Sequence, residues 1–304
     1  MNRTTLLSEL RAAFPALAVR ENEPLARHCS FRIGGPAAVM LLPDSADGIA
    51  SLCRWLRERG VKPFLLGNGT NMLFPDEGLD RIVVKTAPGA GRIAVDGARV
   101  VAEAGATLAQ TASAALAAGL TGLEFAHGIP GSVGGGVVMN AGAYGGELKD
   151  AVVETEYLDA ETELRVLRGA EHDFSYRHSY FSDHEGIVLR SVFSLAAGDP
   201  EAIAARMREL NARRRDKQPL NHPSAGSTFK RPEGQFAGAL IEQAGLKGRS
   251  VGGAQVSEKH AGFIVNTGGA TATDILTLIG MVQDEVRARF GVRLETEVRI
   301  LGED

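Results

Sequence analysis

Apolar residues recur every three or four positions in several segments of the chain, which is the spacing of one face of an α-helix. Within residues 45–60, Ile49, Leu52 and Leu56 share such a face, and Gly60 is suited to ending the helix. The pattern therefore predicts helices at residues 1–20, 45–60, 108–118, 201–215, 236–243 and 273–290.

Short apolar or alternating runs lie between these helices and predict strands. Asp96-Gly97 suits the tight turn of a hairpin that joins residues 92–95 to 99–104. The remaining strands are predicted at 39–42, 62–66, 81–85, 152–159, 163–167, 186–195, 261–266 and 297–301. The strands at 39–42 and 62–66 enclose the helix predicted at 45–60 and indicate a βαβ-type unit.

The composition is that of a globular protein. Of 304 residues, 44% are hydrophobic and 23% charged, which excludes a disordered chain. A net charge of −4 gives no electrostatic reason to expect nucleic acid or an anionic membrane. Cys29 and Cys53 are too few for a disulfide framework. Because we find neither a secretion signal nor an apolar run long enough to span a membrane, we expect a cytoplasmic protein.

Glycine is the exception to this ordinary composition, with 37 residues, and much of it falls in a few loops. Gly67-Asn68-Gly69-Thr70-Asn71 follows a predicted strand, and residues 128–136 hold five glycines in nine positions. Residues 140–145 repeat the pattern. We expect no side chain of 128–136 to form a core, so these loops indicate a diphosphate ligand held by main chain. A strand-ending turn and a flexible hinge are the alternatives.

These loops resemble the flavin-binding loops of the UDP-N-acetylenolpyruvoylglucosamine reductase family. Other segments match that family in the same order, namely Tyr176-Arg177-His178-Ser179, residues 225–230, residues 239–248 with Gly252-Gly253 and Asn266, and residues 294–299. The resemblance extends from about residue 20 to residue 301. The interval between the arginine and serine motifs is short, so the chain resembles the short type of the family, which lacks a tyrosine-bearing insertion. Arg231 stands where long-type members have asparagine.

The resemblance implies an α+β fold of the vanillyl-alcohol-oxidase type, in which two sub-domains hold FAD and a C-terminal α+β domain binds substrate. We expect the sub-domains at residues 1–85 and 86–198 and the substrate domain at 199–296. The strand near 297–301 is expected to return to the first sub-domain.

The resemblance also implies the cofactor and the reaction. FAD is bound non-covalently, although His28-Cys29 invites a covalent link, and NADPH is the co-substrate. The enolpyruvyl ether of UDP-N-acetylglucosamine is reduced to UDP-N-acetylmuramate, a peptidoglycan precursor, with hydride passing from the flavin to C3 and a proton to C2. The implied cofactor-binding residues are Gly67, Asn68, Gly69, Thr70, Asn71, Ile129, Pro130, Gly131, Ser132, Gly134, Gly135, Asn140, Ala141 and Gly142.

Three residues match the family's catalytic positions. Arg177 is the candidate for the substrate carboxylate, because a guanidinium presents a planar fork to it. Ser227 is the candidate proton donor to C2, although only the family match favours it over Ser224 and Thr228. Glu297 is the candidate for stabilising the enol form, and Glu295 shares its strand face and competes for that role.

Other residues are candidates for binding the substrate. Lys217 and Lys230 could hold the diphosphate, Tyr176 could contact the sugar, and one arginine of the run 213–215 could reach the substrate.

We expect no metal, because His127 and His178 have no carboxylate at ligand spacing in the sequence. We expect small-molecule partners only, without nucleic acid or membrane, and a monomer. An oxidase of the same fold and a non-catalytic nucleotide-binding module are the competing functions.

Overall fold

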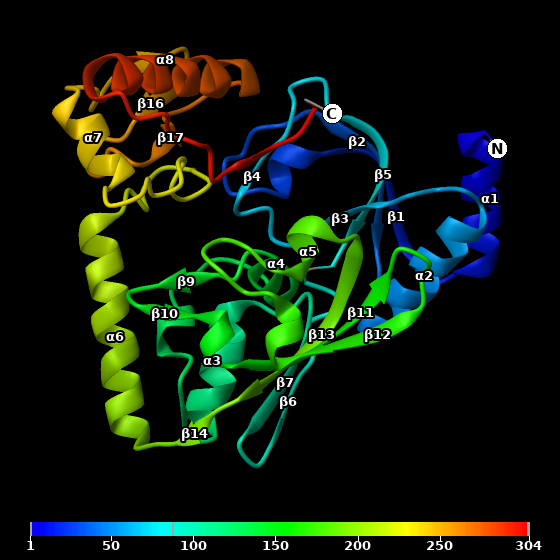
Figure 1. Cartoon of the computed structure of the whole chain (residues 1–304). Helices are drawn as coiled ribbons and strands as arrows, with labels where there is room; N and C mark the ends of the chain where they lie inside the picture. The colour runs from blue at the N-terminus through cyan, green and yellow to red at the C-terminus, as the bar shows by residue number, and fades with distance from the viewer. Residues whose placement is uncertain (1, 87, 303–304) are drawn as a thin grey trace. The chain divides into compact units, whose positions relative to one another are not determined.

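The computed structural model describes residues 2–86 and 88–302, and these form two compact units. Unit 1 comprises the described residues of 1–21, 39–68 and 81–211, and unit 2 comprises 22–38, 69–80 and 212–302. Each unit is therefore built from segments that are far apart in the sequence. Figure 1 gives the course of the chain through its elements.

The centre of unit 1 is a five-stranded antiparallel sheet. Its order is β12 (Leu164–Arg168), β11 (Val152–Asp159), β13 (Gly186–Ser194), β7 (Arg99–Glu103) and β6 (Ile93–Asp96). The β6–β7 hairpin turns at Gly97 with a φ of 55°, as the Asp-Gly pair predicts. Helices α3 (Leu108–Ala117) and α4 (Val133–Val138) pack on this sheet and bury one apolar core with it.

A second core of unit 1 lies around α2 (Ala46–Glu58), which begins at the capping residue Ser45. It includes the apolar face of α1 (Arg3–Ala13). A four-stranded sheet has the order β1 (Ala18–Pro24), β2 (Pro36–Leu42), β5 (Leu79–Lys85) and β3 (Phe64–Leu66), and β3 runs parallel to β5.

Unit 2 contains a three-stranded antiparallel sheet of β15 (Ser250–Val251), β16 (Ala254–Val256) and β17 (Ile264–Asn266), with α8 (Ala272–Phe290) packed on it and α7 (Ala237–Gln243) against α8. Thr271 and Asp274 form a capping box at the start of α8, and Gly291 ends the helix with a φ of 70°. A separate parallel pair joins β18 (Arg299–Ile300) to β4 (Met72–Leu73).

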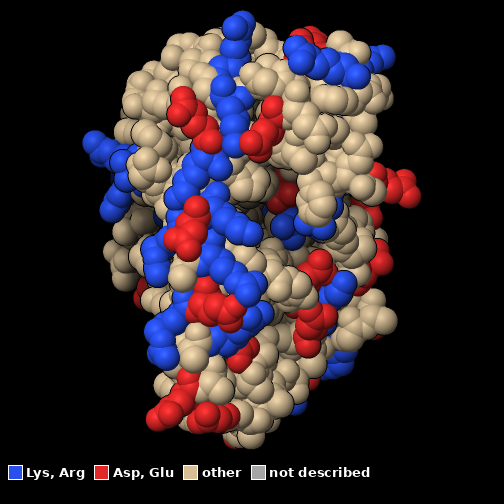
Figure 2. All heavy atoms as spheres, turned by 90° about the vertical axis from the view of Figure 1, so that its left-hand side faces the viewer, with Lys and Arg blue, Asp and Glu red and all other residues tan. Residues whose placement is uncertain are grey.

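The charged helix α6 (Pro200–Lys217) connects the central sheet to the last third of the chain. It buries Ile203, Met207 and Leu210 in the core of unit 1. Figure 2 shows the face on which α6 lies, where Lys and Arg side chains gather along the helix. Arg213 and Arg215, of the run 213–215, are exposed there, and Arg214 is half-buried.

The remaining elements are short. They are β8 (Leu120–Thr121) paired with β14 (Ala196–Ala197), the β9 (Gly142–Ala143) and β10 (Gly146–Glu147) hairpin, α5 (Tyr180–Asp183), and the 3₁₀ turns Leu25–Arg27, Glu124–Ala126, Leu148–Asp150 and Gly169–His172.

The structure corrects two expectations. The helix expected within residues 1–20 ends at Ala13, and β1 begins at Ala18; Met1 lies outside the described residues. The glycine-rich segment 128–136 is not without core side chains, because its second half is α4, in which Val133 and Val137 are fully buried. Ser132 caps this helix by accepting a hydrogen bond from the N–H of Gly135. Within the described part of the chain, no helix has the length and apolar character needed to cross a membrane.

Candidate cofactor and substrate site

Two glycine loops that the sequence assigns to one ligand meet in unit 1. The side-chain amide of Asn68 donates to the carbonyl of Pro130 over 3.1 Å. A Cβ atom on Gly67 would lie 2.3 Å from Oγ of Ser132, so the loops approach more closely than a side chain at Gly67 allows. Lys85 Nζ donates to the carbonyl of Gly67 over 2.8 Å. The two loops are therefore held together as one surface.

This surface carries main-chain donors that the protein does not use. Among residues 2–86 and 88–302, no acceptor is hydrogen-bonded to the backbone N–H groups of Gly67, Asn68, Gly131 and Ser132. Ser132 is only 1% exposed, so its N–H is not freely hydrated. Clustered backbone N–H groups in glycine loops form anion-binding concavities, and these loops fit a diphosphate.

The donors at the start of α4 are used differently. The N–H groups of Val133 and Gly134 donate to the carbonyls of Ala106 and Ala104 over 2.8 and 2.9 Å. A Cβ atom on Gly134 would lie 3.0 Å from that of Ala104. Gly134 is therefore a packing position, and the free donors belong to the loop that precedes the helix.

The third glycine segment is fixed by Asn140, which is fully buried with a φ of 40°. Its amide donates to the Glu147 carboxylate over 3.1 Å and to the carbonyl of Ser175 over 2.9 Å, and its oxygen accepts the N–H of Lys149. Lys149 and Asn140 together hold the pKa of Glu147 below its usual value. Because its side chain is occupied within the protein, Asn140 organises the surrounding loops.

Arg177 belongs to the same group of loops. One of its guanidinium nitrogens donates to the carbonyl of Gly142 over 3.4 Å, and its Cζ lies 5.2 Å from the ring centre of Tyr176. Tyr176 is 46% exposed and Arg177 is half-buried. The arginine proposed for the carboxylate is thus tied to a predicted cofactor residue, Gly142.

The second half of the first loop lies in unit 2. Gly69 has a φ of 60°, and a Cβ atom on it would lie 2.4 Å from the carbonyl oxygen of His28. Within the described part of the chain, the N–H groups of Gly69 and Thr70 also have no protein acceptor. Asn71 donates from its side chain to the carbonyl of Glu297 over 3.0 Å.

The serine and glutamate motifs, which are about 70 positions apart in the sequence, are adjacent in unit 2. Phe229 and Thr296 form an antiparallel bridge, and the N–H of Glu297 donates to the carbonyl of Thr228 over 2.8 Å. Ser227 therefore lies one residue from the backbone partner of Glu297. No pattern in the sequence predicts this pairing.

Thr228 and Glu295, the alternatives to Ser227 and Glu297, each have a partner within the protein. The Thr228 hydroxyl is buried and accepts the N–H of Ile264 over 3.0 Å. Glu295 forms an ion pair with Lys230 at 3.2 Å, and both side chains are largely exposed. These contacts commit the Thr228 hydroxyl and the Glu295 carboxylate to other groups, and the choice of Ser227 and Glu297 stays a prediction. Lys230 is exposed on the surface beside the bridge between Phe229 and Thr296.

A pocket of about 500 Å³ opens in unit 2 beside the end of α6. Arg215 and Lys259 bring positive charge to its lining, and Glu258 brings negative charge. Gln218 also lines it, and its buried Oε1 has no hydrogen-bond partner among the described residues. Lys217 is exposed at the end of α6, next to these residues. The sequence did not single out Gln218 or Lys259.

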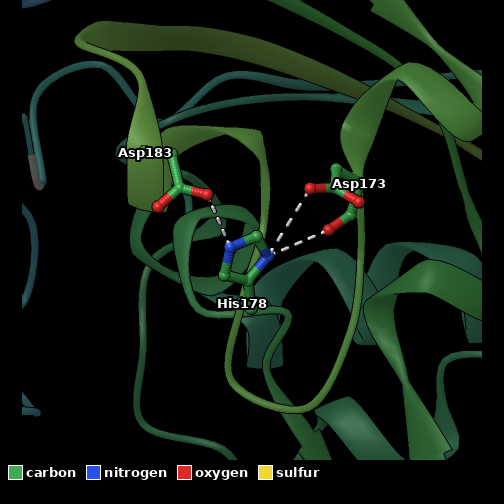
Figure 3. Close-up of side chains that lie close together, drawn as sticks. All are labelled: Asp173, His178 and Asp183. Atoms are coloured by element: carbon green, nitrogen blue, oxygen red, sulfur yellow. Dashed lines mark hydrogen bonds and ion pairs between the residues drawn. The ribbon is translucent and has the colours of Figure 1, made fainter.

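The histidines divide into two cases. His127 Nδ1 lies 2.8 Å from the side-chain nitrogen of Asn211, a structural contact. The statement that His178 lacks a carboxylate partner is wrong, because Asp183 and Asp173 lie on either side of its ring (Figure 3). These carboxylates are five positions before and after the histidine, and the loop brings them together.

The chain is similar to known proteins over most of its length. The chain matches the family model "FAD binding domain" over residues 36–168, and "UDP-N-acetylenolpyruvoylglucosamine reductase, C-terminal domain" over residues 218–301. It is 52% identical to the UDP-N-acetylenolpyruvoylglucosamine reductase of Caldanaerobacter subterraneus over 93% of each chain. It is 50% identical to that of Pediococcus pentosaceus over 96% of this chain and 97% of the relative.

Solved structures give the same result. The UDP-N-acetylenolpyruvylglucosamine reductase from Thermus caldophilus matches 94% of this chain and 100% of its own, with a TM-score of 0.79 and 34% identity. An alkyldihydroxyacetonephosphate synthase matches 65% of this chain and 41% of its own with a TM-score of 0.51 and 16% identity, which shows the fold alone. The predicted α+β fold of the vanillyl-alcohol-oxidase type is confirmed.

Proposed function

Since the chain belongs to the UDP-N-acetylenolpyruvoylglucosamine reductase family, we propose that it reduces enolpyruvyl-UDP-N-acetylglucosamine to UDP-N-acetylmuramate with NADPH as the co-substrate. It is an oxidoreductase with an FAD-binding domain, and its place is in peptidoglycan precursor synthesis. The observation that carries the proposal is the meeting of residues 67–68 with 130–132 inside that domain.

The loops fit the diphosphate of FAD. Gly67 and Ser132 are too close for a side chain at position 67, and the neighbouring N–H groups have no protein acceptor among the described residues. We assign these donors to the diphosphate. We assign a non-covalent attachment, because the ring of His28 is hydrogen-bonded to Glu23 at 2.8 Å and both side chains are almost buried.

When bound, FAD supplies the hydride that is added to C3 of the enolpyruvyl group. The chain must then stabilise the negative charge that develops on C2 and the adjoining carboxylate. Arg177 performs this task, because its guanidinium keeps its charge and binds a carboxylate with two parallel hydrogen bonds. Its contact with Gly142 keeps it beside the cofactor loops.

Ser227 donates the proton that C2 requires. Its hydroxyl has no hydrogen-bond partner within the described part of the chain, so nothing there competes for its proton. An enolate carbon is basic enough to take a proton from a hydroxyl that is held close to it. Glu297, whose N–H donates to the carbonyl of Thr228, stabilises the enol form, and the Asn71 amide fixes its backbone.

We place the uridine diphosphate end of the substrate in the pocket of about 500 Å³, within a substrate domain at residues 199–296. Arg215 and Lys259 suit a diphosphate, and the unpartnered Oε1 of Gln218 suits an N–H donor such as that of a uracil ring. Lys217 and Lys230 are exposed, and Lys217 directly precedes the pocket residue Gln218 in the sequence. Tyr176 offers a ring to the sugar. We propose a monomer that acts in the cytoplasm.

Two measurements test the proposal. The purified protein is titrated with FAD and followed by flavin absorbance and by thermal unfolding. NADPH consumption is then measured with and without enolpyruvyl-UDP-N-acetylglucosamine.

The expected result is a bound flavin and substrate-dependent consumption of NADPH. A protein that binds nucleotide but no flavin would be a nucleotide-binding module. A flavoprotein that consumes NADPH only with oxygen as acceptor would be an oxidase. Either result would overturn the proposed reaction.

A further inference from the structure

Arg177 lies in a strained turn. Arg177 and Asp173 have φ values of 55° and 47°, in the left-handed backbone region that residues other than glycine rarely adopt. Ser175 and His178 exchange two backbone hydrogen bonds of 3.2 Å across the turn. Such a conformation persists only where its surroundings hold it.

Buried polar groups hold one side of this turn. The amide of Asn140 donates to the carbonyl of Ser175 over 2.9 Å, and the hydroxyl of Ser179 donates to the carbonyl of Val138 over 2.8 Å. Asn140 and Ser179 have no exposed surface. Neither side chain titrates, and the Glu147 carboxylate that also accepts from the Asn140 amide has its pKa held below its usual value, so it stays ionised near neutral pH.

The ring of His178 holds the other side. Its Nδ1 lies 3.1 Å from the carbonyl oxygen of Asp173, and its Nε2 lies 3.0 Å from a carboxylate oxygen of Asp183 in α5. The carboxylate of Asp173 is 4.0 Å from Nδ1. Figure 3 shows the ring between its two partners.

This arrangement favours hydrogen bonding over metal binding. The three side chains have ligand atoms within 4.8 Å of one another. However, the two carboxylates face opposite nitrogens of the ring, so an ion on either nitrogen would have one carboxylate beside it (Figure 3). A ring that donates from both nitrogens satisfies both partners.

We infer that His178 is a positioning residue, whose doubly protonated ring joins Asp173 to Asp183, closes the turn and so holds Arg177 ready for the substrate carboxylate. The inference rests on the proposed role of Arg177. Neutral histidine has one N–H and can keep only one of the two bonds. Loss of the second proton therefore loosens the turn.

The charges around the ring favour the protonated form. The carbonyl of Asp173 and then the carboxylate of Asp183 raise the pKa of His178 above its ordinary value of 6.5. Among the described residues, the charged groups that face the ring are Asp173 and Asp183, and on the other side of the turn the Glu147 carboxylate binds the Asn140 anchor. Because the pKa is higher in the closed turn, the stabilisation is complete below pH 6.5 and is lost as the pH rises through the pKa of His178.

The test compares the pH dependence of kcat/KM for the enolpyruvyl substrate in the wild type, His178→Gln and Asp183→Asn. For the wild type, we expect kcat/KM to fall about three- to tenfold as His178 loses its proton, which corresponds to one net hydrogen bond. His178→Gln should lack this step and remain at the lower level.

Asp183→Asn is the decisive variant. Asparagine still accepts a hydrogen bond from Nε2 of His178 but has no charge, so the pKa of His178 should fall. The pH at which kcat/KM decreases should therefore be lower than in the wild type, while kcat/KM at low pH is kept. A merely structural role of Asp183 would not move the midpoint. The matched control is His184→Gln, since His184 stacks on Tyr180 and hydrogen-bonds to its carbonyl, and this variant should keep the wild-type profile.

Titration of the His178 ring by NMR supplies a second readout, and its midpoint should coincide with the step in kcat/KM and move with it in Asp183→Asn. Identical profiles for wild type and His178→Gln, or an unmoved midpoint in Asp183→Asn, would overturn the inference. An Arg177→Ala variant with full activity would instead remove the proposed role of Arg177, whatever the NMR titration shows. The two failures are therefore distinguishable.

Discussion

Replacement of Gly67 by alanine tests the contact on which the cofactor proposal depends. The new Cβ atom would lie 2.3 Å from Oγ of Ser132, much closer than real Cβ atoms approach an oxygen. The next atom, Cβ of Ser132, is 3.5 Å away, an ordinary contact. The conflict therefore lies with one hydroxyl group, in a residue that is 1% exposed.

The size of the effect follows from what Ser132 and Gly67 do. If the hydroxyl rotates away, α4 loses its N-terminal cap, which costs about 1 kcal/mol of stability. If the loops separate, the N–H groups of Gly67 and Asn68 move away from the FAD diphosphate. Loss of one hydrogen bond to a charged acceptor, at about 1.5–3 kcal/mol, weakens FAD binding by about 10- to 150-fold.

The assay measures the Kd of the apoprotein for FAD by quenching of flavin fluorescence and the melting temperature of the same samples. A second variant, Gly67→Ala combined with Ser132→Ala, removes the clashing hydroxyl. It should bind FAD more tightly than Gly67→Ala alone. Gly280→Ala is the control, because nothing lies within 4 Å of its Cβ position in α8; it should leave the Kd unchanged.

If the loss of FAD affinity in the double variant equals the sum of the losses in Gly67→Ala and Ser132→Ala, the reasoning is refuted. A shared clash requires strong coupling between the two positions. Unchanged FAD binding by Gly67→Ala would refute it more directly, because the loops would then not form the diphosphate site.

The remaining predictions concern the chemistry of the proposed reaction and the thermodynamic stability of unit 2. Arg177→Ala should keep FAD but lose at least about a hundredfold in kcat, as measured by NADPH consumption, because it removes a cation aimed at developing charge. Ser227→Ala should reduce its flavin with NADPH at a near-normal rate in stopped flow and then stall with substrate, whereas Ser227→Cys should regain part of the activity; a slowed NADPH step with intact reoxidation would place Ser227 at the nicotinamide. Glu297→Gln should lose less activity than Glu297→Ala if a protonated carboxyl group acts, and equal losses would contradict that form. Thr271→Ala should destabilise the protein by about 1 kcal/mol in urea unfolding, because it removes the cap of α8, while the exposed Thr277→Ala should have little effect.

The periodic helices were the part of the fold that could be predicted from sequence. In α8, Ile275, Leu278, Ile279, Val282 and Val286 are buried at the spacing that the pattern required. The cap at Thr271 and the end at Gly291 follow from residue types with strong local preferences.

The helix α4 was missed because three of its six residues are glycines. Glycine has a low helix propensity, so local preference argues against a helix there. Tertiary packing decides the outcome, because Gly136 lies against Leu148 and Leu108, where a Cβ atom would come within 3.0 and 3.2 Å. A single sequence does not contain that information.

The candidate site also contains parts that the sequence predicts and parts that it does not. The loops at 67–71 and 128–136 were found by composition, and the catalytic candidates by resemblance. The bridge between Phe229 and Thr296 depends on how distant segments fold together, and the ring contacts of His178 depend on the local course of the turn and of α5. Those contacts could not be predicted, because neither has a fixed spacing along the chain.

The parallel pair of β18 and β4 has a consequence for how the protein is made. Arg299 pairs with Met72, so 227 more residues are synthesised after Met72 before its partner is complete. At about 5–20 residues per second, a ribosome needs roughly 10 to 45 s for that interval. The five-stranded sheet of unit 1 can form once residue 194 has emerged. β4, whose Leu73 is 1% exposed in the finished protein, must wait for its partner β18 in the last third of the chain. Until β18 has been made, the backbone edge of β4 lacks this strand partner, and we expect molecular chaperones to bind the nascent chain there.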